Sequence, residues 1–177
     1  VKAPRALHAP NRGLDCGNSG TTARLGLGLL AAQPFSATLT GDRSLRRRPM
    51  RRVAEPLRAM GATIATPEGD GLPVRIQGGH LTPIRWELPV SSAQLKGAIL
   101  LAALAGGVEA SLREPAGRSR DHTERLLRGF GFSVTEAEDG WLHFEPNGAL
   151  VPSAFRIPGD ISSAAFLLGA AALADRG

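Results

Sequence analysis

A run of small polar residues, GNSGTT at positions 17–22, has the composition of a site that binds anions. Asn18 and Ser19 are residue types that cap a helix N-terminus, and an Arg and an apolar stretch follow directly. The free N–H groups and the dipole of such a helix attract anions, and Gly20, lacking a Cβ, lets a ligand approach the backbone. A plain capped helix is the alternative, and the local pattern favours it, since the GK[ST] ending of a P-loop is absent.

Six arginines lie within the ten residues of the segment RSLRRRPMRR, 43–52. Pro49 is expected at the first position of a helix, with Arg48 held in an extended conformation just before it. An arginine fixed in this way clamps a carboxylate or phosphate through its planar fork, while Arg51 and Arg52 face solvent. A solvated basic loop is the alternative, and the segment alone does not decide between the two.

A second polar cluster precedes another apolar helix. Ser91, Ser92 and Gln94 occupy the place that Asn18, Ser19 and Thr21 occupy in the first. Capping is again the simplest interpretation, but Gln94 adds a neutral donor and acceptor to the first helical turn. Lys96 is the one charged residue near that helix start.

A further polar loop contains Ser119, Arg120, Asp121 and His122. His122 has the chemistry of a general base, yet a capping or surface role is favoured for it. No nearby acid–base pair and no metal-ligand spacing is evident. Cys16 is most simply a small core residue.

The charge balance points to an anionic partner. The formal net charge is +5, and 19 of the 21 cationic residues are arginine. Nucleic acid and a small anion are both suggested, but two Trp, six Phe and no Tyr provide few stacking platforms. No run approaches the ~20 apolar residues of a membrane span, and no signal peptide is visible. With a single cysteine, a cytoplasmic location is expected.

The chain repeats itself with a period of about 70 residues. Capping is expected of three serines, Ser19, Ser92 and Ser163, each at the start of an Ala/Leu-rich helix and 73 and 71 residues apart. PLRAMGATI at 56–64 matches LLRGFGFSV at 126–134, and TLTGD at 38–42 matches SLREP at 111–115. Two nearly complete units and the start of a third are therefore predicted, so we expect the chain to be part of a longer protein.

Each unit is expected to contain the same elements in the same order. A buried helix is followed by a short strand, an amphipathic helix ended by Gly61 or Gly131, and a hairpin. The expected strands are 37–40, 63–66, 74–77, 86–88, 110–113, 133–136 and 141–145, and the amphipathic helices are 51–60 and 123–130. Buried helices behind mixed sheets place the fold in the α/β (α+β) class.

Five sequence blocks together resemble the 5-enolpyruvylshikimate-3-phosphate synthase family. They are GNSGTTARL, TGDRSLRRRPM, PVSSAQLKGAILLAAL, EPAGRSRDHTERLL and IPGDISSAAF, in family order and spacing. The resemblance implies a two-lobed fold of repeated βαβαββ units. Residues 1–155 would be the second and third units of the N-terminal lobe, about 1–84 and 85–155, and 156–177 the start of the C-terminal lobe.

The resemblance also implies an activity: transfer of the enolpyruvyl group of phosphoenolpyruvate to the 5-hydroxyl of shikimate 3-phosphate, without cofactor or metal. Carried over by position, the phosphoenolpyruvate-binding residues are Asn18, Gly20, Arg48 and Gln94. The shikimate 3-phosphate-binding residues are Thr21, Ser92, Gln94, Ser119 and Arg120.

The family's general acid and base, its N-terminal Lys-Ser block and its C-terminal lobe are not in this sequence. We therefore expect the chain alone to be inactive and to need the remainder of the enzyme as a complementing segment. Gly20, rather than Ala, implies an intact phosphoenolpyruvate pocket and sensitivity to glyphosate.

Two other functions share some of these features. UDP-N-acetylglucosamine enolpyruvyl transferase has the same fold, but its cysteine lies in a mobile loop, whereas Cys16 directly precedes the helix start. A basic nucleic-acid-binding module of the RNA 3′-terminal phosphate cyclase type would need a His nucleophile motif, which is not found.

Overall fold

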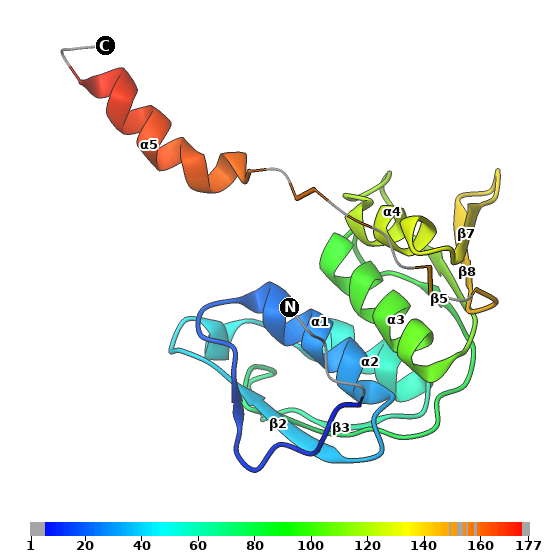
Figure 1. The fold of residues 1–177 in the computed structure, drawn as a ribbon. Helices are drawn as coiled ribbons and strands as arrows, with labels where there is room; N and C mark the ends of the chain where they lie inside the picture. Colours follow the sequence, from blue (N-terminus) through cyan, green and yellow to red (C-terminus); the bar gives the residue numbers. More distant parts are fainter. Residues whose placement is uncertain (1–5, 149, 152–153, 155, 158, 175–177) are drawn as a thin grey trace.

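The computed structural model describes residues 6–148, 150–151, 154, 156–157 and 159–174 (Figure 1). The first residues of the expected range 1–155 and the last residues of the expected range 156–177 lie outside the described residues.

The described chain folds as two units with the same element order. The first contains β1 (Leu14–Asp15), α1 (Gly20–Ala31), β2 (Ser36–Thr40), a short 3-10 helix η1 (Leu45–Arg47), α2 (Arg51–Ala59), β3 (Thr63–Ala65) and β4 (Val74–Gln77). The second contains β5 (Ile84–Glu87), α3 (Ala93–Gly106), β6 (Ala110–Arg113), α4 (His122–Gly129), β7 (Ser133–Glu136) and β8 (Trp141–Glu145). The predicted βαβαββ repeat is confirmed.

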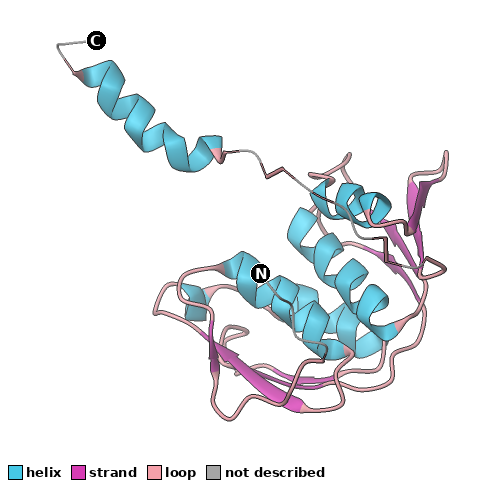
Figure 2. Cartoon of the chain, in the orientation of Figure 1, coloured by secondary structure: helices cyan, strands magenta, loops and turns pink. Residues whose placement is uncertain are grey.

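Each unit builds its own four-stranded mixed sheet, in the orders β1-β2-β4-β3 and β5-β6-β8-β7. The first two strands of each order are parallel, with Leu14 opposite Leu39 and Ile84 opposite Ala110, and the remaining pairs are antiparallel. Figure 2 shows the sheets toward the outside, with α1, α2 and α3 between them. The expected fold class, with buried helices behind mixed sheets, is therefore confirmed.

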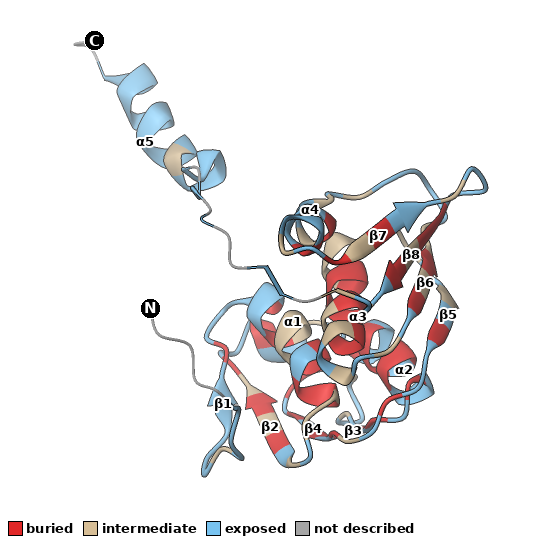
Figure 3. Cartoon of the chain, turned by 45° about the vertical axis from the view of Figure 1, so that its right-hand side comes forward, coloured by how far each residue is buried: buried red, intermediate tan, exposed pale blue. Residues whose placement is uncertain are grey.

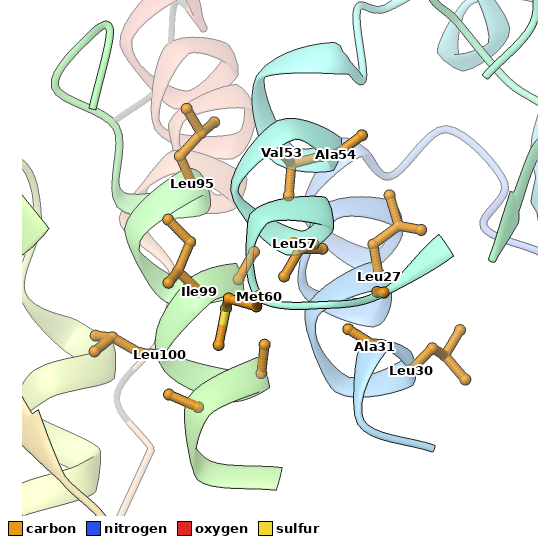
Figure 4. Close-up of a cluster of buried hydrophobic side chains, with 14 of the residues drawn as sticks. Leu27, Leu30, Ala31, Val53, Ala54, Leu57, Met60, Leu95, Ile99 and Leu100 are labelled. Carbon is orange, nitrogen blue, oxygen red and sulfur yellow. The ribbon is translucent and has the colours of Figure 1, made fainter. Parts of the chain in front are cut away.

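The core forms where α1, α2 and α3 meet (Figure 4). Leu27 of α1, Leu57 of α2 and Leu100 of α3 are fully buried there. Eight of the 14 residues of α3 are buried, because its sequence AQLKGAILLAALAG has no polar side chain other than those of Gln94 and Lys96. This packing holds the N-termini of α1 and α3 side by side.

Gly28 allows α1 and α3 to approach this closely. A Cβ at Gly28 would lie 2.1 Å from the carbonyl oxygen of Ala98, a contact with backbone that no rotamer change relieves. We expect Gly28→Ala to lower the free energy of unfolding by about 2 kcal/mol or more, measured by urea denaturation. Gly69→Ala is the control, because a Cβ there meets nothing within 4 Å. Equal stability of the two variants would contradict this packing.

Most predicted element boundaries agree with the structure within two residues. The strands 110–113, 133–136 and 141–145 are confirmed as predicted, whereas the strand expected at 86–88 is β5, Ile84–Glu87. The amphipathic helices are followed by Gly61 and Gly131 with φ of 119° and 91°, after the C-caps Met60 and Phe130. These glycines take the backbone conformation that ends a helix and turns the chain into the hairpin.

Two details of the helix starts were wrong. Pro49 does not open α2; Met50 is the N-cap and Arg51 the first helical residue. The reason is Asp70, whose carbonyl oxygen accepts from Met50 N at 2.8 Å and whose Oδ1 accepts from Arg51 N at 2.6 Å. The expected extended conformation of Arg48 is confirmed, with φ −79° and ψ 133°, and Arg51 and Arg52 are exposed.

The third apolar helix is α5 (Ile161–Leu173), and Asp160 rather than Ser163 caps it. The Asp160 carboxylate accepts from Ser162 N at 2.9 Å and from Ser163 Oγ at 2.5 Å. An aspartate accepts two such bonds at once, so the capping position shifts to it. Figure 3 shows α5 projecting away from the two units, and Phe166 is 84% exposed.

Candidate functional site

The first loop of the site is fixed by the cap of α1. Ser19 Oγ accepts from Thr22 N at 3.1 Å and from Thr22 Oγ1 at 2.9 Å, so the helix begins at Gly20. Gly17, with φ +55°, turns the chain out of the strand into this cap. The capped helix expected from the sequence is confirmed.

Gly20 lies directly against two guanidinium groups. A Cβ at Gly20 would be 3.1 Å from Nη1 of Arg24 and 3.3 Å from Nη1 of Arg48. Since Gly20 has no side chain, both arginine heads reach the N-terminus of α1, where the helix dipole is positive. This places the strongest positive charge of the site beside free backbone N–H groups.

A hydrogen-bond relay holds the Arg48 head. Its Nη2 donates to Asn18 Oδ1 at 3.0 Å, and Asn18 Nδ2 donates to Asp42 Oδ2 at 2.7 Å. Asp42 Oδ1 accepts from Leu45 N at 2.7 Å. The bonds from Asn18 and then from Leu45 hold the pKa of Asp42 below its ordinary value. Asp42 therefore remains charged and fixes which way the Asn18 amide faces.

Gln94 joins the two units at the site. Its Oε1 accepts from Arg24 Nη1 at 2.5 Å, and its Nε2 donates to Thr21 Oγ1 at 2.8 Å. Arg24 also donates through Nη2 to the carbonyl oxygen of Pro49 at 3.2 Å. The first turns of α1 and α3 and the residue after Arg48 are thus connected by one network.

The two guanidinium groups in this network lack anionic partners. Among the described residues, no carboxylate oxygen lies within 4 Å of a nitrogen of Arg24 or Arg48. Burial, and then the charges of Arg48 and Arg52, lower the pKa of Arg24. Like charges held close together at a helix N-terminus are stabilised by an anion, and arginine forks suit carboxylate or phosphate.

A second loop lies at the N-terminus of α3. Ser92 caps this helix, its Oγ accepting from Leu95 N at 3.4 Å. Ser92 N donates to Glu114 Oε1 at 2.9 Å, and Ser119 N donates to Glu114 Oε2 at 3.0 Å. Glu114 thereby brings together the two serines that were predicted as site residues.

Next to this loop, Lys96 forms ion pairs with two acidic residues. Its Nζ lies 3.0 Å from Glu114 Oε2 and 2.6 Å from Glu124 Oε1. Burial lowers the pKa of Lys96, but Glu124 and Glu114 outweigh burial and the net shift is upward. Burial likewise raises the pKa of Glu114, yet bonds from Ser119 and Lys96 outweigh it and the net shift is downward. Lys96 and Glu114 therefore remain charged at neutral pH.

Arg120 faces the same region as Thr21 and Gln94. These three residues line an open depression of about 210 Å³ between α1, α3 and the start of α4, with Leu25, Ala93, His122 and Thr123. Arg120 and His122 are exposed, and Asp121 rather than His122 is the N-cap of α4. A basic side chain beside the first turns of α1 and α3 extends the positive surface toward the second unit.

The structure brings the predicted residues into one region: Asn18, Gly20, Thr21, Arg48 and Gln94 through the α1–α3 network, Ser92 and Ser119 through Glu114, and Arg120 in the adjoining depression. Arg24, Asp42, Glu114 and Lys96 were not predicted as site residues. Arg24 had a usable signal, since it lies four residues after Gly20 and hence on the same helix face. Cys16 is buried, as expected for a core residue, and burial raises the pKa of its thiol.

Two further features are absent from the described part of the chain. It contains no cluster of three or more His, Cys, Asp or Glu that could hold a metal ion. No described helix is long and apolar enough to cross a membrane.

The fold of this chain is also found in a solved structure. The structure of EPSP synthase from Acinetobacter baumannii superposes with a TM-score of 0.79 and 48% sequence identity, covering 90% of this chain and 36% of that one. The chain thus has the enolpyruvyl transferase fold.

The sequence narrows this class to one family. The model of the family described as EPSP synthase (3-phosphoshikimate 1-carboxyvinyltransferase) matches residues 1–176, and the chain belongs to this family. The 3-phosphoshikimate 1-carboxyvinyltransferase of Alkalilimnicola ehrlichii is 51% identical over 170 residues, 96% of this chain. That of Anaeromyxobacter dehalogenans is 52% identical over 177 residues, 98% of this chain. The chain spans 38% and 39% of the length of these two relatives.

Proposed function

We propose that this chain forms the N-terminal-lobe part of an enzyme that makes 5-enolpyruvylshikimate 3-phosphate. The reaction transfers the enolpyruvyl group of phosphoenolpyruvate to the 5-hydroxyl of shikimate 3-phosphate and releases phosphate. The observation that carries the proposal is the pair of guanidinium groups of Arg24 and Arg48, held against Gly20 with no carboxylate within 4 Å among the described residues. Both substrates are multiply anionic, and family membership supports them as the ligands.

The proposed roles follow the two halves of the site. Phosphoenolpyruvate binds at Gly20, Arg48, Asn18 and Gln94, where the positive charge is densest. Shikimate 3-phosphate binds at Thr21, Ser92, Gln94, Ser119 and Arg120, so that Gln94 contacts both substrates. Helix N-termini and arginine forks then offset the substrate charges in the arrangement that also stabilises charge in a transition state.

The chemistry needs groups beyond these binding residues. Protonation of the methylene carbon of phosphoenolpyruvate and removal of the hydroxyl proton call for a general acid and a general base. We propose that the remainder of the enzyme supplies them, and that this chain is inactive until that segment complements it. Residues 1–155 would be the second and third units of the N-terminal lobe, and 156–177 the start of the C-terminal lobe. No cofactor or metal enters the proposed reaction.

The proposal is tested by titrating the chain with shikimate 3-phosphate in a calorimeter, with phosphoenolpyruvate added afterwards. We expect binding with one site per chain, and no turnover when both substrates are present. Retention on a nucleic-acid column that falls with salt, together with no binding of shikimate 3-phosphate, would instead support a nucleic-acid-binding module. Turnover by the chain alone would refute the division of the site between segments.

Two expectations from the sequence stay predictions. Sensitivity to glyphosate, inferred from Gly20, is decided by inhibition assays on the full-length enzyme. A cytoplasmic location is decided by fractionation of cells that express it.

A further inference from the structure

An acidic residue closely follows the corresponding strand in each unit, although the two positions differ by one residue in the aligned repeat. Asp42 follows β2 and Glu114 follows β6, and these strands are the second of the parallel pair in each sheet. The first strands of the two pairs lead into the loops that start α1 and α3. The carboxyl ends of parallel strands lie at one edge of a sheet, so each acidic residue stands beside the helix-start loop of its unit.

Each carboxylate uses both of its oxygens to join two loops. Asp42 accepts from Asn18 in the helix-start loop and from Leu45 in the following loop, both at 2.7 Å. Glu114 accepts from Ser92 in the helix-start loop at 2.9 Å and from Ser119 in the following loop at 3.0 Å. The donors differ between the units, but the connection between the loops is the same.

The loops joined in this way carry the residues proposed to bind substrate. In the first unit the relay from Asp42 through Asn18 ends on Arg48. In the second unit Glu114 accepts directly from the backbone N–H groups of Ser92 and Ser119. Lys96 Nζ lies 3.0 Å from Oε2 of the same carboxylate. Charge-assisted hydrogen bonds of this kind are about twice as strong as neutral ones and set geometry as well as stability.

We propose that Asp42 and Glu114 are equivalent positioning residues, each a carboxylate clamp that sets the distance between two substrate-binding loops. The part of this proposal that concerns substrate affinity rests on the proposed function. The part that concerns the distance between the loops is independent of the proposed function.

Glu114 is tested with the variants Glu114→Ala and Glu114→Gln, and the exposed Glu109→Gln serves as the control in the same unit. Hydrogen exchange of the Ser92 and Ser119 amides is followed by NMR. In Glu114→Ala both amides are expected to exchange about ten- to a hundredfold faster, with a smaller change at Ile99 inside α3. Glu114→Gln keeps an acceptor oxygen, so the exchange rates of the two amides in this variant should lie between those in Glu114→Ala and those in the wild type.

Affinity for shikimate 3-phosphate is then measured by calorimetry on the same proteins. We expect Glu114→Ala to raise the Kd at least about tenfold and Glu109→Gln to leave it unchanged. A folded Glu114→Ala variant with unchanged Ser92 and Ser119 exchange, or with unchanged affinity, overturns the clamp. No binding by the wild type would count against the proposed function, while the exchange result would still decide whether Glu114 holds the loops.

Asp42 is tested with Asp42→Ala against the exposed control Glu68→Ala. Loss of the Asp42 carboxylate frees the Asn18 amide, so its side-chain NH₂ resonances should shift, and affinity for phosphoenolpyruvate should fall about tenfold. Asp42→Asn retains an acceptor oxygen. It should therefore shift the Asn18 resonances less and lower the affinity for phosphoenolpyruvate less than Asp42→Ala does. Unshifted Asn18 resonances in a folded Asp42→Ala variant would overturn the equivalence of the two carboxylates.

Discussion

Replacing Arg48 with alanine is expected to weaken phosphoenolpyruvate binding more than a hundredfold. The Arg48 head lies at the N-terminus of α1, is oriented by Asn18 at 3.0 Å and has no carboxylate within 4 Å among the described residues. A charge-assisted hydrogen bond contributes about 1.5–3 kcal/mol, and a fork that makes two of them exceeds the ~2.7 kcal/mol of a hundredfold change. NMR titration of the shikimate 3-phosphate complex of this chain measures the effect, because it also resolves weak binding.

The control for this prediction is the neighbouring arginine. Arg47→Ala makes the same change in net charge one residue away, and Arg47 is exposed. Arg47→Ala should change the Kd for phosphoenolpyruvate by no more than a few-fold, since screened surface charges contribute little to binding. Arg48→Lys retains the charge but not the planar fork, and should recover only part of the lost affinity. Equal losses in the Arg47 and Arg48 variants would mean that general positive charge, and not the fork of Arg48, attracts the ligand.

The fold was predictable because its signals are local and occur twice. Apolar runs after Ser19 and Ser92, the glycines at 61 and 131 and the turn residues of the hairpins each mark an element from neighbours in sequence. The repeat then strengthened each assignment by a second copy. The errors at Pro49 and Ser163 arose where a partner outside the expected pattern, Asp70 or Asp160, supplied the cap.

Motifs suggested the residues of the candidate site, but they did not predict how those residues connect. Gly20, Arg48 and Gln94 were found from motifs, yet the contact between Gln94 and Arg24 joins positions 70 residues apart. Such a contact depends on the packing of α1 against α3, which no local pattern specifies. The sequence marked Lys96 as a lone charge near an apolar helix start, but its partners Glu114 and Glu124 lie on a later loop and helix. A buried lysine in an apolar helix nevertheless implies a buried acid somewhere, and that is the signal that was available.

Replacing Lys96 with methionine is expected to lower the free energy of unfolding by about 3–5 kcal/mol at neutral pH. Methionine fills a similar volume, so the loss comes from the two carboxylates left behind. Glu124 is 2% exposed, its Oε1 depends on Lys96, and its Oε2 has no hydrogen-bond partner among the described residues. Glu114 keeps the N–H groups of Ser92 and Ser119, so Glu124 carries most of the penalty. Urea denaturation at pH 8 measures the difference.

The pH dependence separates this electrostatic cause from a packing defect. In the wild type the raised pKa of Lys96 gives stability that is present below about pH 10.4 and is lost as pH rises through the folded value. The lowered pKa of Glu114 gives stability that is present above about pH 4.3 and is lost as pH falls through the folded value. Between these limits the wild-type network contributes a constant amount.

Without Lys96, the folded variant holds buried carboxylate charge that no cation offsets, so the variant is expected to regain stability relative to the wild type as pH falls. The difference in free energy of unfolding between Lys96→Met and the wild type should therefore be smaller at pH 5 than at pH 8. Adding Glu124→Leu removes the buried unpaired charge and should recover most of the lost stability, because an apolar replacement of a whole buried pair is often neutral. The opposite outcome is a difference in free energy of unfolding that stays constant with pH and that Glu124→Leu does not reduce. It would show that the lysine acts through its packing and not through its charge.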